Sequence, residues 1–320
     1  MRSWFLLFAC NLMWALQFTC VKLVQDQVGP LVTVWGPMTL ATIMLYPLIR
    51  REQKTGHGSE GQRKRDVLLF LVLALVGVFP GQVFITWGTR MSLASNAALL
   101  ALTLPVSTAA LAVILLGERM TTVRWISFAM ALVGVLMCSD VNFRTLDFGR
   151  SYLSGNALIL MGTLGSAFYN SYGKKVLERY SPMEMLFYTY AAMFFVMTPL
   201  TIFKEGSVLM GHPKFTGRTW IGLALLTFFH NYLSMVLFLK ALKQLDAIQA
   251  ALSNYLITFF GVPIAAMWLG ERFRSVAFVG GVLVLGSTLL ITIWDSKQPA
   301  PVLQKLETGN CKLENRNWRA

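Results

Sequence analysis

The amino-acid sequence predicts an all-α integral membrane protein with ten transmembrane helices, arranged as two inverted repeats of five helices. Three observations lead to this fold class. The chain is 55% hydrophobic and only 13% charged, about half the charged fraction of a usual soluble domain. Its apolar residues form long blocks, and a membrane-spanning helix needs roughly 20 mainly apolar residues. The tetrapeptide Leu-Gly-Glu-Arg occurs twice, beginning at Leu116 and at Leu269, which are 153 residues apart.

Ten apolar blocks have about the length of a membrane span. They cover residues 3–23, 30–49, 67–88, 92–115, 122–139, 153–173, 183–203, 219–239, 247–268 and 275–294. Because these blocks and their short links use nearly the whole chain, no room remains for a soluble catalytic domain. We expect the first block to be a span rather than a signal peptide, since Asn11, Gln17 and Lys22 interrupt it and no clean cleavage site follows.

The repeated tetrapeptide anchors a longer match between the two halves of the chain. At the same spacing, residues 97–99 (Ala-Ala-Leu) fall on residues 250–252 (Ala-Ala-Leu). Each half holds five spans, so the second half must enter the membrane in the opposite sense. We predict a first five-helix repeat over residues 3–140, a second over 153–294 and a cytoplasmic tail over 295–320. Inverted repeats are typical of secondary transporters, whose binding site lies near the midplane between the halves.

The net charge of +13 is distributed as membrane topology requires, which argues against a nucleic-acid partner. Ten spans place both termini on one side, and the segments on that side hold 19 of the 28 Lys and Arg residues. These segments are residue 2, 50–66, 116–124, 174–182, 240–246 and the tail after 295. Because positive charge accumulates on the cytoplasmic side, we expect a multi-pass protein of the plasma or cytoplasmic membrane with both termini in the cytoplasm. Its expected partners are the lipid bilayer and a small-molecule solute, with a homodimer left open.

Several segments give the sequence a specific resemblance to a known family. The first span reads "MWALQFTCVKLV", and the two segments that end in the tetrapeptide read "SNAALLALTLPVSTAALAVILLGERMT" and "AIQAALSNYLITFFGVPIAAMWLGERFR". With two five-span halves, the chain resembles the drug/metabolite transporter superfamily, in particular its EamA branch, over residues 5–293. The resemblance implies a ten-span transporter. Many relatives carry an arginine early in the second span, where this chain has Trp35, Gly36 and Pro37 instead.

The tetrapeptide itself predicts a tight hairpin at the membrane surface. Gly117 and Gly270 can end a helix in the left-handed conformation. Glu118 and Glu271 would then lie near the start of the next helix, where negative charge is favoured. A gating role is the alternative to this structural one.

Polar residues at helical spacing mark the faces that could meet a solute. The first span carries Asn11, Trp14, Phe18 and Lys22 on one face, and the sixth span repeats this stripe with Asn170 and Lys174. The candidate substrate-binding residues are Trp14, Lys22, Asn96, Asn170, Lys174, His230, Tyr232, Gln249 and Asn254. Each has a structural alternative, because polar side chains also bond helix to helix and lysines near span ends reach toward the headgroups. His230 could carry a proton or stay a neutral, hydrogen-bonded side chain.

The absence of acidic residues from the span centres narrows the expected solute. Asp and Glu lie only at span ends, whereas carriers of cations usually need a central carboxylate. A neutral, zwitterionic or anionic solute is therefore favoured. The four cysteines lie far apart, and the sequence has no HExxH or GxSxG motif, so we expect no metal, no cofactor and no enzyme activity.

The function predicted from the sequence is a secondary transporter, an exporter or exchanger that works by alternating access. Its expected solute is a small organic metabolite, amino-acid-like or another neutral, zwitterionic or anionic molecule. An antiporter of sugar phosphates or nucleotide-sugars is the alternative within transport. A non-transporting membrane scaffold or an intramembrane enzyme is the alternative from a different class.

Overall fold

The computed structural model describes residues 2–54, 63–92, 100–138, 152–210, 215–257, 259–260, 264 and 275–296, which are helical with short turns and contain no strand. The α-helices are α1 (Arg2–Val24), α2 (Pro30–Lys54), α3 (Arg63–Val72), α4 (Ile85–Met91), α6 (Thr103–Leu116), α7 (Thr122–Cys138), α8 (Leu153–Val176), α9 (Pro182–Met210), α10 (Gly217–Leu225), α11 (Met235–Gln244), α12 (Ala247–Ser253) and α14 (Ser275–Ser296). Three π-helices interrupt them: η1 (Leu73–Val78), η2 (Pro80–Phe84) and η3 (Leu226–Ser234). The all-α fold class is confirmed.

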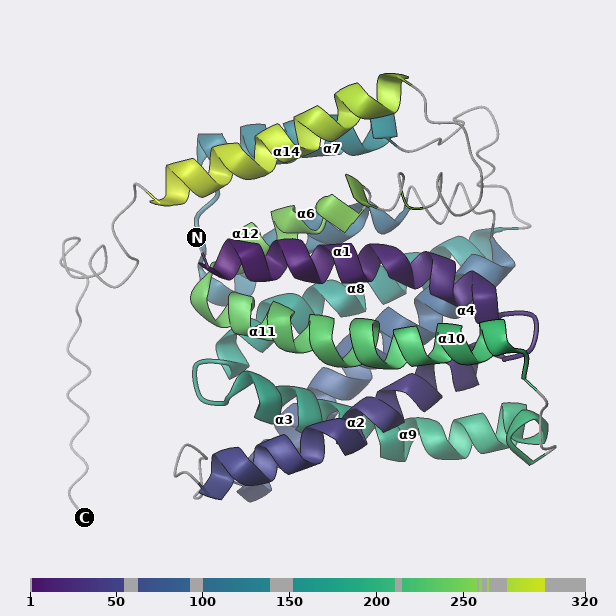
Figure 1. Ribbon diagram of the computed structural model, residues 1–320. Helices are drawn as coiled ribbons and strands as arrows, with labels where there is room; N and C mark the ends of the chain where they lie inside the picture. Colours follow the sequence, from purple (N-terminus) through teal and green to yellow (C-terminus); the bar gives the residue numbers. More distant parts are fainter. Residues whose placement is uncertain are drawn as a thin grey trace, which may run out of the picture.

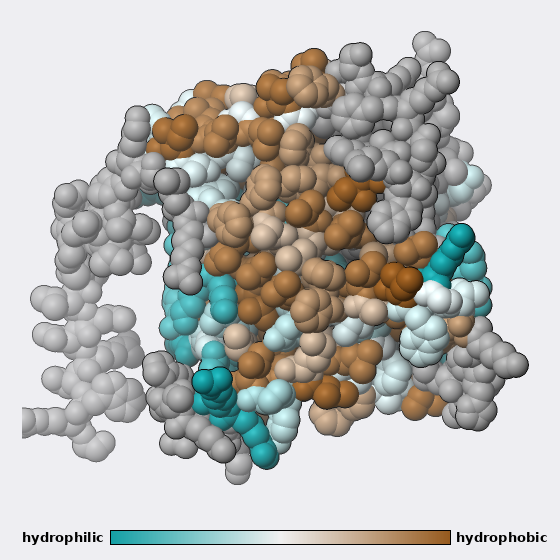
Figure 2. Space-filling view, viewed as in Figure 1, coloured by the Kyte–Doolittle hydropathy of each residue, from teal (hydrophilic) through white to brown (hydrophobic). Residues whose placement is uncertain are grey.

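The helices lie side by side, with their axes running from left to right in Figure 1. Figure 2 shows a broad hydrophobic belt around the middle of the visible face, with hydrophilic residues toward the two ends of the helices. Four segments of the described chain are long and apolar enough to cross a membrane, namely 30–52, 66–88, 182–206 and 217–244. Shorter apolar helices cover 3–16, 103–116, 122–137 and 278–294. The count of ten spans stays a prediction.

Helices that correspond in the predicted repeat pack in pairs at two edges of the molecule. α7 packs against α14, and α2 packs against α9. The contact between α7 and α14 is close, because a Cβ on Gly134 would lie only 2.6 Å from the backbone oxygen of Gly280. Between these pairs, α1 packs against α10, η3 and α11, while α8 packs against α4, η2 and α6. The first helix of each predicted half therefore lies between the two edge pairs, with one face exposed.

One end of the bundle brings together the segments that the charge pattern predicts on the cytoplasmic side. It is the left end in Figure 1, where α1 begins and α11 ends. The contacts here join Ser3 to Gln244, Glu52 to Ser181, Asp66 to Tyr180, Lys174 to Leu242 and Glu118 to Ala247. At the opposite end, contacts join Gln27 to Thr216 and Glu205 to Leu31 and Val32. These contacts place the described links at two opposite ends of the bundle.

Gly117 ends α6 in the left-handed conformation, with φ 68° and ψ 22°, as the tetrapeptide predicts. Glu118 differs from the expectation. The next helix, α7, begins only at Thr122, so Glu118 lies outside its first turn, and its carboxylate reaches the start of α12 instead.

Candidate functional site

The interior face of α1 carries two of the polar residues singled out by helical spacing. Asn11 is fully buried, and its Nδ2 donates to the backbone oxygen of Leu7 at 2.8 Å and to Oγ of Ser253 at 3.1 Å. The ring of Trp14 lies 5.0 Å from that of Phe238 on α11, measured between centroids. The indole Nε1 of Trp14 is buried and has no hydrogen-bond partner among the described residues. α1 is thus tied to α12 by one amide and leaves one donor free in the interior.

A second polar group lies at the end of α12. Ser253 is buried, and its Oγ donates to the backbone oxygen of Ala250 at 2.7 Å. Asn254 is 5% exposed, and neither atom of its amide finds a partner in the described part of the chain. The ring of Tyr255 packs edge-on against Phe128 with 6.2 Å between centroids, and its hydroxyl is also unpartnered there. This end of α12 therefore holds several polar atoms that the described protein does not satisfy.

α8 contributes Asn170 to the interior, as the stripe on the sixth span predicts. Asn170 is buried and makes no hydrogen bond to another described residue. The neighbouring Tyr169 is buried, with its hydroxyl unpartnered within the described ranges. Ser171 donates to the backbone oxygen of Thr108 at 3.0 Å, which ties α8 to α6.

The predicted residues His230 and Tyr232 lie in the π-helix η3. The Nδ2 of Asn231 donates at 2.9 Å to the backbone oxygen of Leu226, five residues earlier, and the hydroxyl of Tyr190 donates to the backbone oxygen of Asn231 at 3.1 Å. His230 is buried, and its Nδ1 has no partner among the described residues. Tyr232 is half-buried and packs near other aromatic rings of the same segment.

The π-helices are the feature that sequence reasoning missed. η1 begins at Leu73 and η3 at Leu226, the same 153-residue spacing as the tetrapeptide. η2 follows η1 closely and begins at Pro80, which cannot donate a backbone hydrogen bond. Nothing comparable in the sequence marks η3. π-Helical turns occur frequently at functional sites. η1 packs against α8, and η3 packs against α1.

We take six of the buried polar atoms that lack a partner among the described residues as the candidate solute site. They are Trp14 Nε1, Tyr169 OH, His230 Nδ1, Tyr255 OH and both amide atoms of Asn254, while further such atoms lie on Asn11, Thr108, Ser127, Thr189 and Thr201. They come from α1, α8, η3 and the chain at the end of α12, and both α1 and α8 pack against α12. A buried polar atom without a partner costs about 1–3 kcal/mol. Water or a polar solute would remove that cost, and the set is made of neutral donors and acceptors.

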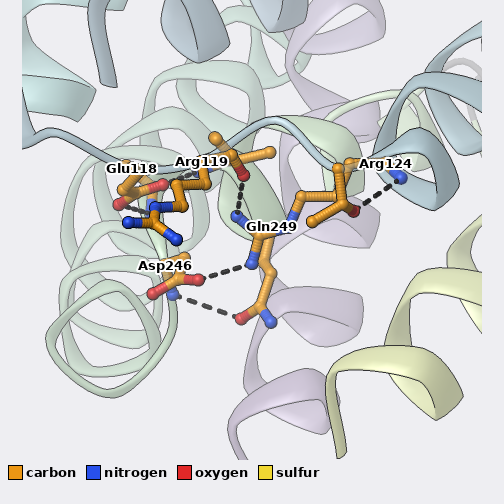
Figure 3. Close-up of polar contacts among 8 residues, drawn as sticks. Glu118, Arg119, Arg124, Asp246 and Gln249 are labelled. Carbon is orange, nitrogen blue, oxygen red and sulfur yellow. Dashed lines mark hydrogen bonds and ion pairs between the residues drawn. The ribbon is translucent and has the colours of Figure 1, made fainter. Parts of the chain in front are cut away.

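Gln249 lies away from these atoms along α12, in a polar cluster at the start of the helix (Figure 3). Its Oε1 accepts a hydrogen bond from the backbone N–H of Asp246 at 3.2 Å and completes a capping box. Nη2 of Arg124 lies 2.6 Å from Oδ2 of Asp246, and Nη1 donates to the backbone oxygen of Arg119 at 3.1 Å. Gln249 therefore serves the helix start in this arrangement.

Glu118 completes this cluster and binds α12 directly. Its two carboxylate oxygens accept hydrogen bonds from the backbone N–H groups of Ala247 at 2.7 Å and Ile248 at 2.9 Å. Burial, and then the nearby charge of Asp246, raise the pKa of Glu118 above its usual range. The carboxylate supplies negative charge at the positive end of a helix.

Lys174 lies beside the same turn and contacts protein rather than open space. Its Nζ donates to the backbone oxygens of Leu242 at 2.8 Å and Lys243 at 3.1 Å, at the end of α11. Three further predicted residues, Asn96, Gly270 and Glu271, lie outside the described residues, as does the side chain of Lys22. Among the described residues, no group of three His, Cys, Asp or Glu side chains could hold a metal ion.

A helical bundle with an apolar belt, several apolar spans and some buried polar side chains within a hydrophobic core indicates an integral multi-pass membrane protein. The model of the EamA-like transporter family matches residues 1–139 and again residues 153–293, and the chain belongs to this family. The resemblance drawn from the sequence is thereby confirmed.

Curated relatives and one solved structure agree with this assignment. A probable terminal-alkyne amino-acid exporter of Streptantibioticus cattleyicolor is 24% identical over 87% of this chain and 89% of its own length. The uncharacterized transporter YetK of Bacillus subtilis is 22% identical over 87% and 82% of the two chains. An S-adenosylmethionine uptake transporter of Rickettsia prowazekii is 24% identical over 69% and 70%. One crystal structure aligns with a TM-score of 0.73 at 15% identity, over 91% of this chain and 96% of the other, and supports the fold.

Proposed function

We propose that the protein is a secondary transporter that moves a small solute with an amino-acid-like head group across the membrane by alternating access. Transport in general follows from membership of the family. The substrate class and the mechanism are the proposal. The observation that carries it is the set of buried, neutral polar atoms on α1, α8, η3 and the end of α12 that have no partner among the described residues.

The chemistry of these atoms fits a zwitterion or a neutral polar molecule. Indole, phenol and amide groups donate and accept hydrogen bonds without fixing a charge. A membrane interior penalises unpaired ions, so a solute with an internally balanced charge suits such a lining. Phosphate recognition would need several basic side chains, and Lys174 already binds two backbone oxygens. Sugar phosphates and nucleotide-sugars are therefore less well supported.

The names of two relatives point to the same chemical group. One is called an amino-acid exporter and the other an S-adenosylmethionine uptake transporter. An amino acid and S-adenosylmethionine both carry an α-amino group and a carboxylate on one carbon. The direction of transport differs between these two names, so the proposal leaves direction to measurement.

Several observations support two inverted halves as the basis of the mechanism. The family model matches the chain twice, over ranges close to the predicted repeats. The pairs α7–α14 and α2–α9 each join corresponding helices, and π-helices begin 153 residues apart. Helix-end carboxylates also correspond: Glu52 near the end of α2 accepts from Ser181 before α9, and Glu205 near the end of α9 accepts from Leu31 and Val32 at the start of α2.

The proposal places both termini in the cytoplasm, because 19 of the 28 basic residues belong to segments of one side. The contacts that gather four of those segments and the chain beside Arg2 at one end of the bundle support this grouping.

Counterflow in liposomes tests the proposal. Purified protein is reconstituted, the vesicles are loaded with a millimolar unlabelled amino-acid mixture, and entry of trace labelled amino acids is followed, with S-adenosylmethionine and glucose 6-phosphate in parallel series. The proposal expects transient accumulation of at least one amino acid or of S-adenosylmethionine. Accumulation of glucose 6-phosphate alone would favour the phosphate-antiporter alternative and refute the proposed substrate class.

A further inference from the structure

The turn between α11 and α12 is short and is held at both of its helix ends by side chains from other parts of the chain. α11 ends at Gln244 and α12 begins at Ala247, so only Leu245 and Asp246 separate them, both in extended conformation. The last carbonyls of one helix and the first N–H groups of the next therefore lie close together along the chain. Helix ends carry opposite partial charges, negative at the carbonyl end and positive at the N–H end.

Each helix end receives a side chain of the opposite charge. The ammonium group of Lys174, from the last turn of α8, donates to the backbone oxygens of Leu242 and Lys243 at the end of α11. The carboxylate of Glu118, from the link between α6 and α7, accepts from the N–H groups of Ala247 and Ile248 at the start of α12. Charge-assisted hydrogen bonds of this kind are stronger than neutral ones.

A third side chain holds the turn itself. Arg124 in the first turn of α7 binds the carboxylate of Asp246, and its side chain is only 9% exposed. It also donates to the backbone oxygen of Arg119, which fixes it to the link that carries Glu118 (Figure 3). The turn is thus attached to α7, α8 and the α6–α7 link by Glu118, Arg124 and Lys174, which we call the turn latch.

The turn latch holds the start of α12, the helix whose far end carries part of the candidate solute site. α12 is a single short helix, and Ser253, Asn254 and Tyr255 lie at its far end. Asn11 on α1 contacts this far end through Ser253. A rotation of α12 about its attached start would therefore move these polar side chains relative to α1.

We propose that Glu118, Arg124 and Lys174 are positioning residues that keep the bundle closed at this end, and that the solute site opens to this face when the turn latch releases. The inference rests on the proposed transport function and deepens it by assigning the contacts that separate the site from one face. Closure at the opposite end would depend on other contacts, such as Glu205 with Leu31 and Val32.

Thiol accessibility from each face tests the turn latch. In a variant whose four native cysteines are replaced by serine, Ser253→Cys places a nearly isosteric thiol behind the latch, where the native side chain is buried. Sealed vesicles of known orientation are treated with a membrane-impermeant, charged thiol reagent from one face at a time. Glu118→Ala and Lys174→Met should each raise the labelling rate from the latch face about tenfold or more, the change expected on losing one charge-assisted contact.

Matched controls separate latch release from general loosening. Lys175→Met removes an exposed charge of the same sign as Lys174 one residue along α8 and should leave the rate unchanged. Glu205→Ala removes a carboxylate with the same kind of contact at the opposite end and should not raise labelling from the latch face. If Glu118→Ala is not recovered as a monodisperse protein, Lys174→Met and Arg124→Met decide the outcome.

Two results would overturn the inference. The latch variants could label as slowly as the parent protein, or their labelling rate could rise equally from both faces. Counterflow measured on the parent protein keeps the two proposals apart. If the parent transports and the latch variants label like the parent, the latch inference fails alone. If the parent moves none of the tested solutes while labelling rises from the latch face only, the proposed function fails and the closure at this end stands.

Discussion

The side-chain amide of Asn11 donates a hydrogen bond to the hydroxyl of Ser253, across 242 residues of sequence and 3.1 Å of space. This contact joins the first helix of one predicted half to the fourth-span region of the other. Both side chains are fully buried. Each side chain has a second hydrogen bond within its own helix, Asn11 to Leu7 and Ser253 to Ala250. Substituting either residue therefore removes the contact between the helices but leaves the other side chain with one hydrogen bond.

A double-mutant cycle should therefore measure this contact cleanly. Asn11→Ala and Ser253→Ala remove the same interhelical bond, and we expect a coupling energy of roughly 0.6 kcal/mol, the average for such bonds in membrane bundles. The free energy of unfolding is measured by titration with a denaturing detergent. Fully additive effects of the two substitutions would show that α1 and α12 do not meet through these residues.

Removing an unpartnered hydroxyl from the candidate site should weaken solute binding without lowering the stability of the protein. Tyr255→Phe deletes a hydroxyl with no partner among the described residues, so the unfolding temperature without solute should stay the same or rise. The shift in unfolding temperature caused by saturating solute should shrink, because a donor to the solute is lost.

Tyr190→Phe is the matched control for this effect. The Tyr190 hydroxyl donates to the backbone oxygen of Asn231 at 3.1 Å, and its loss removes a buried hydrogen bond between α9 and η3, which costs about 0.5–1.5 kcal/mol. A Tyr255→Phe protein as destabilised as Tyr190→Phe would mean that the Tyr255 hydroxyl is bonded to protein and is unavailable to a solute.

The turn latch should close more firmly as the pH falls. Burial and the neighbouring Asp246 raise the pKa of Glu118 in the closed arrangement, whereas a water-exposed Glu118 would keep the ordinary pKa of a glutamate. The closed arrangement therefore binds the proton more tightly, and acidification stabilises it between the ordinary and the raised pKa. The charge of Arg124 offsets part of this rise in the pKa of Glu118, and Lys174, whose own pKa burial lowers, also faces the carboxylate.

The measurement is the labelling rate of Ser253→Cys from the latch face between pH 7.5 and pH 5. The rate is divided at each pH by that of the same thiol in the Glu118→Ala background, which cancels the pH dependence of the thiol reaction. This ratio of labelling rates should decrease as the pH is lowered from 7.5 to 5. A constant or rising ratio would contradict the role given to Glu118.

The orientation follows from the distribution of basic residues and can be tested on intact cells. In the cysteine-free protein, Arg218→Cys at the start of α10 should react with an impermeant thiol reagent added outside, and Glu178→Cys should be protected. Both native side chains are exposed, and neighbouring residues make contacts at opposite ends of the bundle, Thr216 with Gln27 and Tyr180 with Asp66. Labelling of Glu178→Cys with protection of Arg218→Cys would invert the topology.

Local patterns in the sequence anticipate the elements of this fold well. Hydrophobic blocks locate the helices, because a span must bury its backbone in lipid and needs a nearly continuous apolar run. Gly117 ends α6 in the left-handed conformation that its residue type favours. The grouping of basic residues anticipates which links meet at one end of the bundle.

The parts of the candidate site that depend on contacts between distant segments were less accessible to sequence reasoning. Lys174 lies in the predicted stripe, but only the fold brings it to the carbonyl end of α11. Glu118 stabilises α12 rather than the helix that follows it in sequence. The π-helix η3 depends on the Asn231 amide bonding a carbonyl five residues earlier, a geometry that residue types alone do not specify.

The central claim is that this chain carries a small amino-acid-like solute through a site lined by neutral polar groups, and counterflow tests it most directly. Liposomes that contain the parent protein and are loaded with the unlabelled amino-acid mixture should transiently accumulate a labelled amino acid or S-adenosylmethionine. This accumulation should fall at least severalfold with Tyr255→Phe or Asn254→Leu, because each substitution removes polar atoms from the site. If liposomes containing folded parent protein accumulate none of these solutes above protein-free liposomes, the account of substrate and site is contradicted.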